Sequence, residues 1–234
     1  MIGRRGSPAP SNDNPIDPGA APAFPLYRLR EQIADGVVQA IALVASLAAA
    51  VAIVAMAVGE LSAIPTLSLV AYALGLTGVF AFSAGYHWVS RPAWKEILRR
   101  LDHAAIFVMI AGSCTPFALV KVGGPLGYGV FAVVWAVAIL GVALKLLLPR
   151  RFERTALILY VLQGWAVLAA VEPLILAVAP LPLLLFAAGG ALYTIGVGFH
   201  VWHRLPYQNA IWHGFVLAAA GCQYAAILEA VVLA

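Results

Sequence analysis

Three short polar clusters in an otherwise apolar chain carry the residues that could do chemistry. They are SAGYH at Ser83–His87, LDH at Leu101–His103 and NAIWH at Asn209–His213. Ser83 and His87 are four residues apart, as are Asn209 and His213, so each pair would share one face of a helix. Imidazole nitrogens with a carboxylate nearby suit zinc, which in catalytic sites takes three protein ligands and one water. The clusters therefore predict a metal or proton site, provided that the fold brings them together.

The elements that must position these clusters are membrane-spanning helices. Of the 234 residues, 63% are hydrophobic and 10% are charged, whereas soluble domains carry about a quarter of charged residues. Apolar runs of about 20 residues, long enough to cross the hydrocarbon as helices, recur along the chain. We place seven spans at 37–58, 67–88, 104–120, 128–148, 155–178, 183–201 and 211–233. The expected fold is all-α, a polytopic bundle of seven transmembrane helices.

The amino-terminal segment has a different composition. Residues 1–26 are polar and rich in proline, and they contain too few apolar residues to form a packed core. We expect a disordered tail at 1–26, followed by a single membrane domain at 27–234.

The basic residues give the bundle an orientation. If the amino terminus is cytoplasmic, thirteen of the fourteen Lys and Arg residues fall in inner segments, and only Lys121 falls outside. This distribution follows the positive-inside rule, and it favours an odd number of spans with the carboxyl terminus outside. The net charge of +4 is thus explained by topology and does not indicate nucleic-acid binding.

This topology brings the polar clusters to the inner face of the membrane. The second helix ends there with His87, the third begins there with Asp102 in its first turn, and the seventh begins there with Asn209 and His213. Ionisable side chains within membrane segments are costly and usually mark a functional site. We therefore expect these residues, with Ser83, to lie at one depth in the bundle core.

The same side chains also have ordinary structural explanations. A histidine near a helix end can hydrogen-bond to water or to lipid headgroups, and this explanation is strongest for His103, His200 and His203. Asp102 could cap its helix, because carboxylates favour the positive end of a helix dipole. Asp35 and Gln39, at the start of the first helix, could border the same site. The residue types alone leave these alternatives open.

Four longer stretches of the chain match the pattern of a known family. They are FSAGYH at 82–87, RLDHAAIFVMIAGSCTPF at 100–117, YVLQGW at 160–165 and RLPYQNAIWHGFVLAAAG at 204–221. In this order they resemble the hemolysin III family, the bacterial branch of the progestin and adiponectin receptor superfamily. The resemblance runs from about Glu31 to the carboxyl terminus. It implies a seven-helix protein of the bacterial inner (plasma) membrane with a zinc site on the inner side.

The resemblance also implies a role for each site residue. The metal ligands of the family match His87, His213 and position 209, its aspartate at position 102 holds the water that the metal binds, and its serine matches Ser83. This chain departs from the pattern at Asn209, where the family has histidine. An amide oxygen is a poor substitute for imidazole on zinc, and no other histidine on that face of the seventh helix replaces it.

The first helix departs from the family pattern as well. Gln32, Asp35 and Gln39 stand where the resemblance leads us to expect Glu, Asn and His. Both departures bear on the same inner-side site, so they put its metal occupancy in question.

Two functions of different classes fit these features. The first is zinc-dependent hydrolysis of an amide- or ester-linked membrane lipid, by resemblance to the ceramidase-like members of the superfamily. Zinc on His87, His213 and Asn209 would activate a water, Asp102 would orient it and take its proton, and Ser83 would bond the substrate or an oxyanion.

The second function is non-enzymatic sensing of a ligand or of the state of the membrane, with a degenerate metal site, which Asn209 favours. A third hypothesis, a pore, would need polar residues recurring through several helices, whereas here they gather at one end.

Overall fold

The computed structural model describes residues 28–148 and 151–233, and the elements in these ranges are all helical. The predicted tail at 1–26 lies outside the described residues. The elements are α1 (Leu29–Ala57), α2 (Ala63–Trp88), α3 (Pro92–Pro116) with η1 (Phe117–Val122), α4 (Gly124–Leu147), α5 (Glu153–Trp165) with η2 (Ala166–Ala170) and α6 (Val171–Ala177), α7 (Pro180–Val201), and α8 (Gln208–Ile227) with η3 (Leu228–Val232). Where elements follow one another directly they join into one continuous helical span. The described ranges contain seven spans that are long and apolar enough to cross a membrane, which confirms the predicted fold class.

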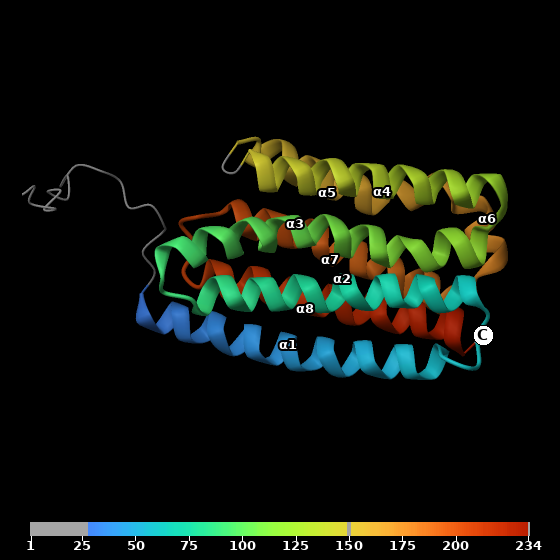
Figure 1. Cartoon of the computed structure of the whole chain (residues 1–234), viewed down its shortest axis with the longest axis horizontal. Coiled ribbons are helices and arrows are strands. Elements are labelled where there is room, and N and C mark those ends of the chain that lie inside the picture. Colours follow the sequence, from blue (N-terminus) through green and yellow to red (C-terminus); the bar gives the residue numbers. More distant parts are fainter. Residues whose placement is uncertain (1–27, 149–150, 234) are drawn as a thin grey trace, which may run out of the picture.

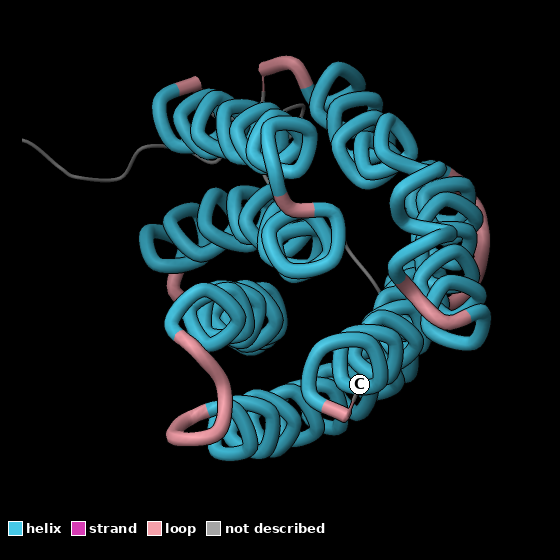
Figure 2. The backbone as a smooth tube through the Cα atoms, turned by 90° about the vertical axis from the view of Figure 1, so that its right-hand side faces the viewer, coloured by secondary structure: helices cyan, strands magenta, loops and turns pink. Residues whose placement is uncertain are grey.

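The seven helical spans lie side by side in one bundle, with α1 at one edge and α4 and α5 at the other (Figure 1). Helix α2 packs between α1 and α3, and α4 packs on the far side of α3. Helix α8 packs against both α7 and α1, so the last span returns to the first. The view along the bundle in Figure 2 shows the helices as separate columns joined by short loops. This return places the first turns of α8 beside the first turns of α1.

Small residues let the helices approach closely where they cross. A Cβ atom at Gly75 on α2 would lie 3.0 Å from Cα of Met109 on α3, and one at Gly112 on α3 would lie 3.0 Å from the carbonyl oxygen of Ala71. On α7, a Cβ atom at Gly189 would lie 2.7 Å from Cγ of Gln223 on α8. Close backbone approach through small residues is typical of helix packing in membranes.

The outward faces of the helices are apolar. Val44 on α1 is 69% exposed, Leu74 on α2 is 68% exposed and Leu184 on α7 is 67% exposed. The backbone polar groups of these spans are satisfied within the helices, as a bilayer requires. Such surfaces fit a hydrocarbon surrounding, so the bundle has the properties of a multi-pass integral membrane protein.

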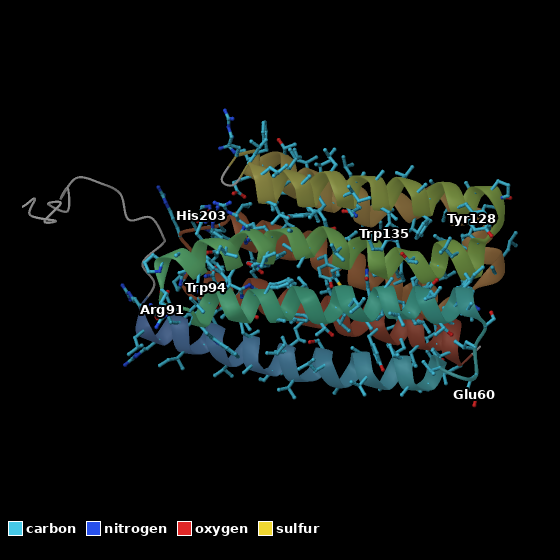
Figure 3. All side chains as sticks on the ribbon, viewed as in Figure 1. Glu60, Arg91, Trp94, Tyr128, Trp135 and His203 are labelled. Atoms are coloured by element: carbon cyan, nitrogen blue, oxygen red, sulfur yellow. The ribbon has the colours of Figure 1, made fainter. Side chains whose placement is uncertain are left out.

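We call the end of the bundle at which α1 begins and α2 ends the basic end. It holds most of the described basic residues: Arg28, Arg30, Arg91, Lys95, Arg99, Arg100, Lys145, Arg151, Arg154 and Arg204. Figure 3 shows Arg91, Trp94 and His203 towards this end and Glu60 and Tyr128 towards the other. Lys121 lies in η1, near the opposite end. That the basic end faces the cytoplasm stays a prediction.

The predicted start of the third span was wrong by about three turns. Helix α3 begins at Pro92 and not near residue 104, and Pro92 occupies the first helical turn, where its missing N–H costs nothing. Hydropathy detects only the apolar part of a helix, and the charged segment 92–103 continues the same helix beyond it. Asp102 therefore lies in the third turn of α3 and cannot act as its N-cap.

Candidate metal centre

Three side chains from the first, second and last spans meet at the basic end. Nδ1 of His213 on α8 lies 2.6 Å from Oδ1 of Asp35 on α1, and Nδ1 of His87 on α2 lies 2.7 Å from Oδ2 of the same carboxylate. The two imidazole ring centroids are 4.9 Å apart. We call these three residues the His–Asp cluster. Because each carboxylate oxygen contacts one imidazole, Asp35 joins the two histidines that the sequence singled out.

A chain of hydrogen bonds extends the cluster along α1 and α2. Asp35 and Gln39 are four residues apart and share the inward face of α1, where both are buried. Nε2 of Gln39 donates to Oγ of Ser83 at 2.8 Å, and this oxygen lies 3.5 Å from Nε2 of His213. Ser83 and His87 share a face of α2 in the same way, as their spacing predicted. The result is a polar network of five side chains in the bundle core, four of them buried and one, His87, partly buried.

The cluster opens into a cavity of about 1100 Å³ inside the bundle. Near the basic end its wall includes Ser83, Asp102 and the three residues of the His–Asp cluster. Farther along the bundle the wall becomes apolar, with Leu174 of α6 and Leu183 of α7 among its residues. A cavity of this volume, with few convergent polar groups and a largely apolar wall, is typical of a ligand site.

The donor set of the cluster fits a zinc ion. Two imidazoles and one carboxylate form one of the known ligand sets of catalytic zinc. Ligand atoms of Asp35, His87 and His213 all lie within 4.8 Å of one another. Ligand atoms around a tetrahedral zinc lie roughly 3.3 Å apart, given metal–ligand bonds of about 2.0–2.1 Å. The hydrogen-bonded contacts in the cluster would therefore have to lengthen by less than about 1 Å, and a pair of ligand atoms as far apart as 4.8 Å would have to close by up to about 1.5 Å.

The structure brings together some of the predicted site residues and not others. His87, His213 and Ser83 lie within one hydrogen-bonded network. Asp102 lines the same cavity, and its Oδ2 atom lies 4.0 Å from Nδ1 of His103, outside the His–Asp cluster. Asn209 lines the cavity as well. The roles predicted for Asp102 and Asn209 stay predictions.

Asp35 is the member of the cluster whose part the sequence analysis missed. The sequence predicted only that Asp35 could border the site, and the residue departs from the family pattern. The available signal was an acid and an amide four residues apart, Asp35 and Gln39, which extend the polar start of α1 into its long apolar part. Its contact with His213 depends on the packing of α8 against α1, which no pattern within either helix specifies.

The remaining histidines lie closer to the cavity than the sequence suggested. Nδ1 of His103 is 2.7 Å from the carbonyl oxygen of Arg99, one turn back along α3. The ring of His200 packs against Trp212, with centroids 5.0 Å apart. Both residues line the cavity, as does His203. They enlarge the polar part of the cavity near the basic end.

The chain matches the model of one protein family and is similar in sequence to known proteins. A family model described as "Haemolysin-III related" matches residues 28–224. The chain is 32% identical to "Hemolysin-3" of Bacillus cereus over 200 residues, which cover 86% of this chain and 91% of that protein. It is 30% identical to "Hemolysin-3 homolog" of Bacillus subtilis over 203 residues, covering 87% of this chain and 95% of that protein.

A more distant relative comes from animals. The chain is 30% identical to human "Monocyte to macrophage differentiation factor" over 165 residues, which cover 67% of each chain. No solved structure matches the chain.

Proposed function

The chain belongs to the hemolysin III-related family, and on this premise we propose that it is a zinc-dependent hydrolase of amide- or ester-linked membrane lipids. The observation that carries the proposal is the meeting of Asp35, His87 and His213 in the wall of a large, mostly apolar cavity. A metal-capable cluster at the polar end of an apolar cavity suits a substrate with a carbonyl headgroup and a long hydrocarbon chain.

The zinc ligands that we propose differ from the set that the sequence suggested. Asp35 would supply the third ligand, in place of the histidine that this chain lacks at position 209. A carboxylate oxygen is a common zinc ligand beside two imidazoles, whereas an amide oxygen is a weak one. A bound zinc would act as a Lewis acid towards the lipid carbonyl and would make a water molecule nucleophilic near neutral pH.

The protein side chains would then orient the substrate and the attacking water and exclude bulk water. The apolar wall formed in part by α6 and α7 would hold the hydrocarbon chain and keep bulk water from the reacting carbonyl. Ser83, at the polar end, would donate a hydrogen bond to the developing oxyanion. Asp102, on the same wall, would orient the attacking water and accept its proton.

The expected position of the His–Asp cluster in the membrane supports a lipid as the substrate. The positive-inside rule would direct the basic end to the cytoplasm, so the cluster would lie near the inner leaflet of a bacterial inner membrane. A lipid in that leaflet would carry its polar group at the depth of His87 and His213.

Metal analysis with matched variants tests the proposal. We expect the detergent-purified protein to contain about one equivalent of zinc per chain, and Asp35→Ala, His87→Ala and His213→Ala each to lose most of it. Asn209→Ala is the matched control and should retain its zinc. The same samples, given amide- and ester-linked lipids, should release fatty acid in parallel with zinc content. Less than roughly a tenth of an equivalent in the native protein would rule out the metal step.

The second candidate function is a non-enzymatic membrane sensor. The observation that favours it is that Asn209 stands where the family has histidine, while the Asp35 carboxylate contacts both imidazoles. Asn209→His separates the two functions. A sharp rise in zinc content, with no lipid hydrolysis by the native chain, would identify a degraded site and a sensing role. Unchanged zinc content with active hydrolysis would support the ligand set that includes Asp35.

A further inference from the structure

Two polar side chains in the cavity wall, away from the His–Asp cluster, have atoms without a hydrogen-bond partner. The hydroxyl of Tyr193 on α7 and Oε1 of Gln223 on α8 are buried atoms with no partner in the described part of the chain. Both residues line the cavity, and Gln223 is 6% exposed. We propose that these two residues, which we call the Tyr–Gln subsite, bind a hydroxyl group carried part-way along the hydrocarbon chain of the lipid. The inference rests on the proposed function, because it names the class of lipid that the same cavity would accept.

Unpartnered polar atoms are exceptional at this depth of the bundle. The hydrocarbon core of a bilayer offers no water to satisfy them, and native proteins leave few buried polar atoms without a partner. Two other hydroxyls in the cavity wall, those of Ser113 and Thr194, donate to carbonyl oxygens of their own helices at 3.0 Å and 2.8 Å. The free atoms of Tyr193 and Gln223 therefore point to a polar group of the ligand as their partner.

Close packing of α7 against α8 positions the Tyr–Gln subsite. A Cβ atom at Gly189 would lie 2.7 Å from Cγ of Gln223, and one at Gly196 would lie 3.0 Å from Cβ of Phe215 on α8. Tyr193 is four residues from Gly189 and three from Gly196, so it shares their face of α7. Both side chains of the subsite thus belong to the facing surfaces of the two helices, at the wall of the cavity.

The chemistry of the two free atoms selects a hydroxyl group. A phenol hydroxyl can donate and accept a hydrogen bond, whereas an amide oxygen can only accept. A hydroxyl on the ligand could donate to Gln223 and accept from Tyr193 at the same time. A ketone could only accept, which would leave Gln223 unpartnered, and a plain methylene chain would satisfy neither residue. The subsite should therefore favour hydroxylated chains over keto chains, and both over unsubstituted chains.

The distance from the His–Asp cluster sets the position of the hydroxyl on the chain. His213 and Gln223 are ten residues apart on α8, which corresponds to about 15 Å along a helix. An extended hydrocarbon chain advances about 1.25 Å per carbon, given bonds of about 1.52 Å at angles of about 111°. A lipid whose carbonyl lies at the cluster would therefore bring a carbon roughly ten to fourteen bonds away to the subsite. A hydroxyl beside the carbonyl would not reach it.

Tyr72 on α2 offers a matched control for Tyr193. Its hydroxyl is also a buried atom without a partner in the described part of the chain, and the residue is 0% exposed. It is eleven residues from Ser83 along α2, so it lies about as far from the cluster as Gln223 does. Tyr72 lies outside the wall of the cavity. Tyr72→Phe therefore removes the same kind of hydroxyl at a similar depth and leaves the subsite intact.

Ligand competition tests the subsite without any turnover. The probes are the fatty acids that the proposed reaction would release, and each would displace radiolabelled octadecanoic acid from the full chain in detergent. We expect 12-hydroxyoctadecanoic acid to bind about 10-fold more tightly than the 2-hydroxy isomer, because it gains about two hydrogen bonds. The two isomers carry the same groups, so their comparison removes most of the effect that a hydroxyl has on partition into micelles.

Variants assign this preference to the two side chains. Tyr193→Phe and Gln223→Leu should each lower the preference about 3-fold, and the double variant should abolish it. Tyr72→Phe should keep the native preference. Each substitution removes a buried polar atom that has no partner, so none of the variants should melt at a lower temperature than the native protein without ligand.

Two results would overturn the Tyr–Gln subsite. One is a native protein that binds neither hydroxy acid, or binds the two isomers equally. The other is a double variant that melts like the native protein and keeps the native preference. Zinc content and lipid hydrolysis, measured on the same preparation, distinguish these outcomes from failure of the proposed function. Hydrolysis without the preference contradicts only the subsite, and the preference without zinc or hydrolysis contradicts only the proposed hydrolase.

Discussion

A methyl group at Gly141 of α4 should destabilise the bundle by overpacking its core. A Cβ atom built there would lie 2.4 Å from Cε2 and Cζ of Phe107 on α3, and 2.5 Å from its Cδ2. Carbon atoms in contact are normally about 3.5–4.0 Å apart, so the ring would have to move by about 1 Å. Phe107 has little room to do so, because it is 1% exposed and its ring centroid lies 4.4 Å from that of Tyr160.

The size of the effect follows from this geometry. Overpacking of a well-packed core costs about 1–3 kcal/mol. For a chain of this size each kcal/mol lowers Tm by about 2–4 °C, so Gly141→Ala should lower Tm by roughly 2–12 °C. Thermal unfolding of the purified protein in one detergent, at one scan rate, measures the shift. Gly129→Ala on the same helix is the control, because a Cβ atom at Gly129 meets nothing within 4 Å. Alanine is the better helix former, so the control should not melt earlier.

A second variant tests whether the new methyl group meets the ring of Phe107. Phe107→Leu removes part of the ring that the new methyl group meets, so it should recover part of the stability that Gly141→Ala loses. Residues in direct contact show such coupling, whereas distant sites are additive. If Gly141→Ala and Gly129→Ala melt at the same temperature, or if Phe107→Leu adds its full cost to Gly141→Ala, the packing described between α3 and α4 is incorrect.

Three further predictions concern the basic end and the topology. Glu153→Ala should lower Tm more than Lys145→Ala, because the Lys145 side chain is 5% exposed and would lose its partner at 2.8 Å, whereas that of Glu153 is 45% exposed and keeps Arg99. Equal losses in thermal melts would contradict this asymmetry. Tyr160→Phe removes one hydrogen bond to the carbonyl oxygen of His103, so it should cost about 0.5–1.5 kcal/mol in the same assay. Reporter fusions should locate the amino terminus in the cytoplasm and the carboxyl terminus outside, and termini on one side would contradict seven spans.

The apolar part of the fold was readable from the sequence. The second span ends at Trp88 and the sixth at Val201, as predicted, because hydropathy falls where the chain leaves the membrane. The start of the third span was missed, since a helix does not end where hydropathy falls if charged residues such as Lys95 and Arg99 continue its backbone hydrogen bonding. Hydropathy therefore predicts which segments cross the membrane better than it predicts where helices begin.

The site was predictable only in part. Helix direction and four-residue spacing were enough to expect His87, His213 and Ser83 at one depth, and the structure joins them in one network. The third partner was not predictable, because the contact of Asp35 with both imidazoles depends on the rotation of α1 against α2 and α8. The family resemblance indicated that a histidine is missing at Asn209, whereas only the packing of distant helices brings the Asp35 carboxylate against His87 and His213.

Zinc-edge X-ray absorption of the purified protein tests the central claim most directly. The account predicts a zinc ion with two imidazole nitrogens and at least one carboxylate oxygen at about 2.0–2.2 Å, and loss of the oxygen ligand or of the zinc itself in Asp35→Ala. A spectrum with three imidazoles, or one unchanged in Asp35→Ala, would contradict the assignment of Asp35, His87 and His213 as the metal centre.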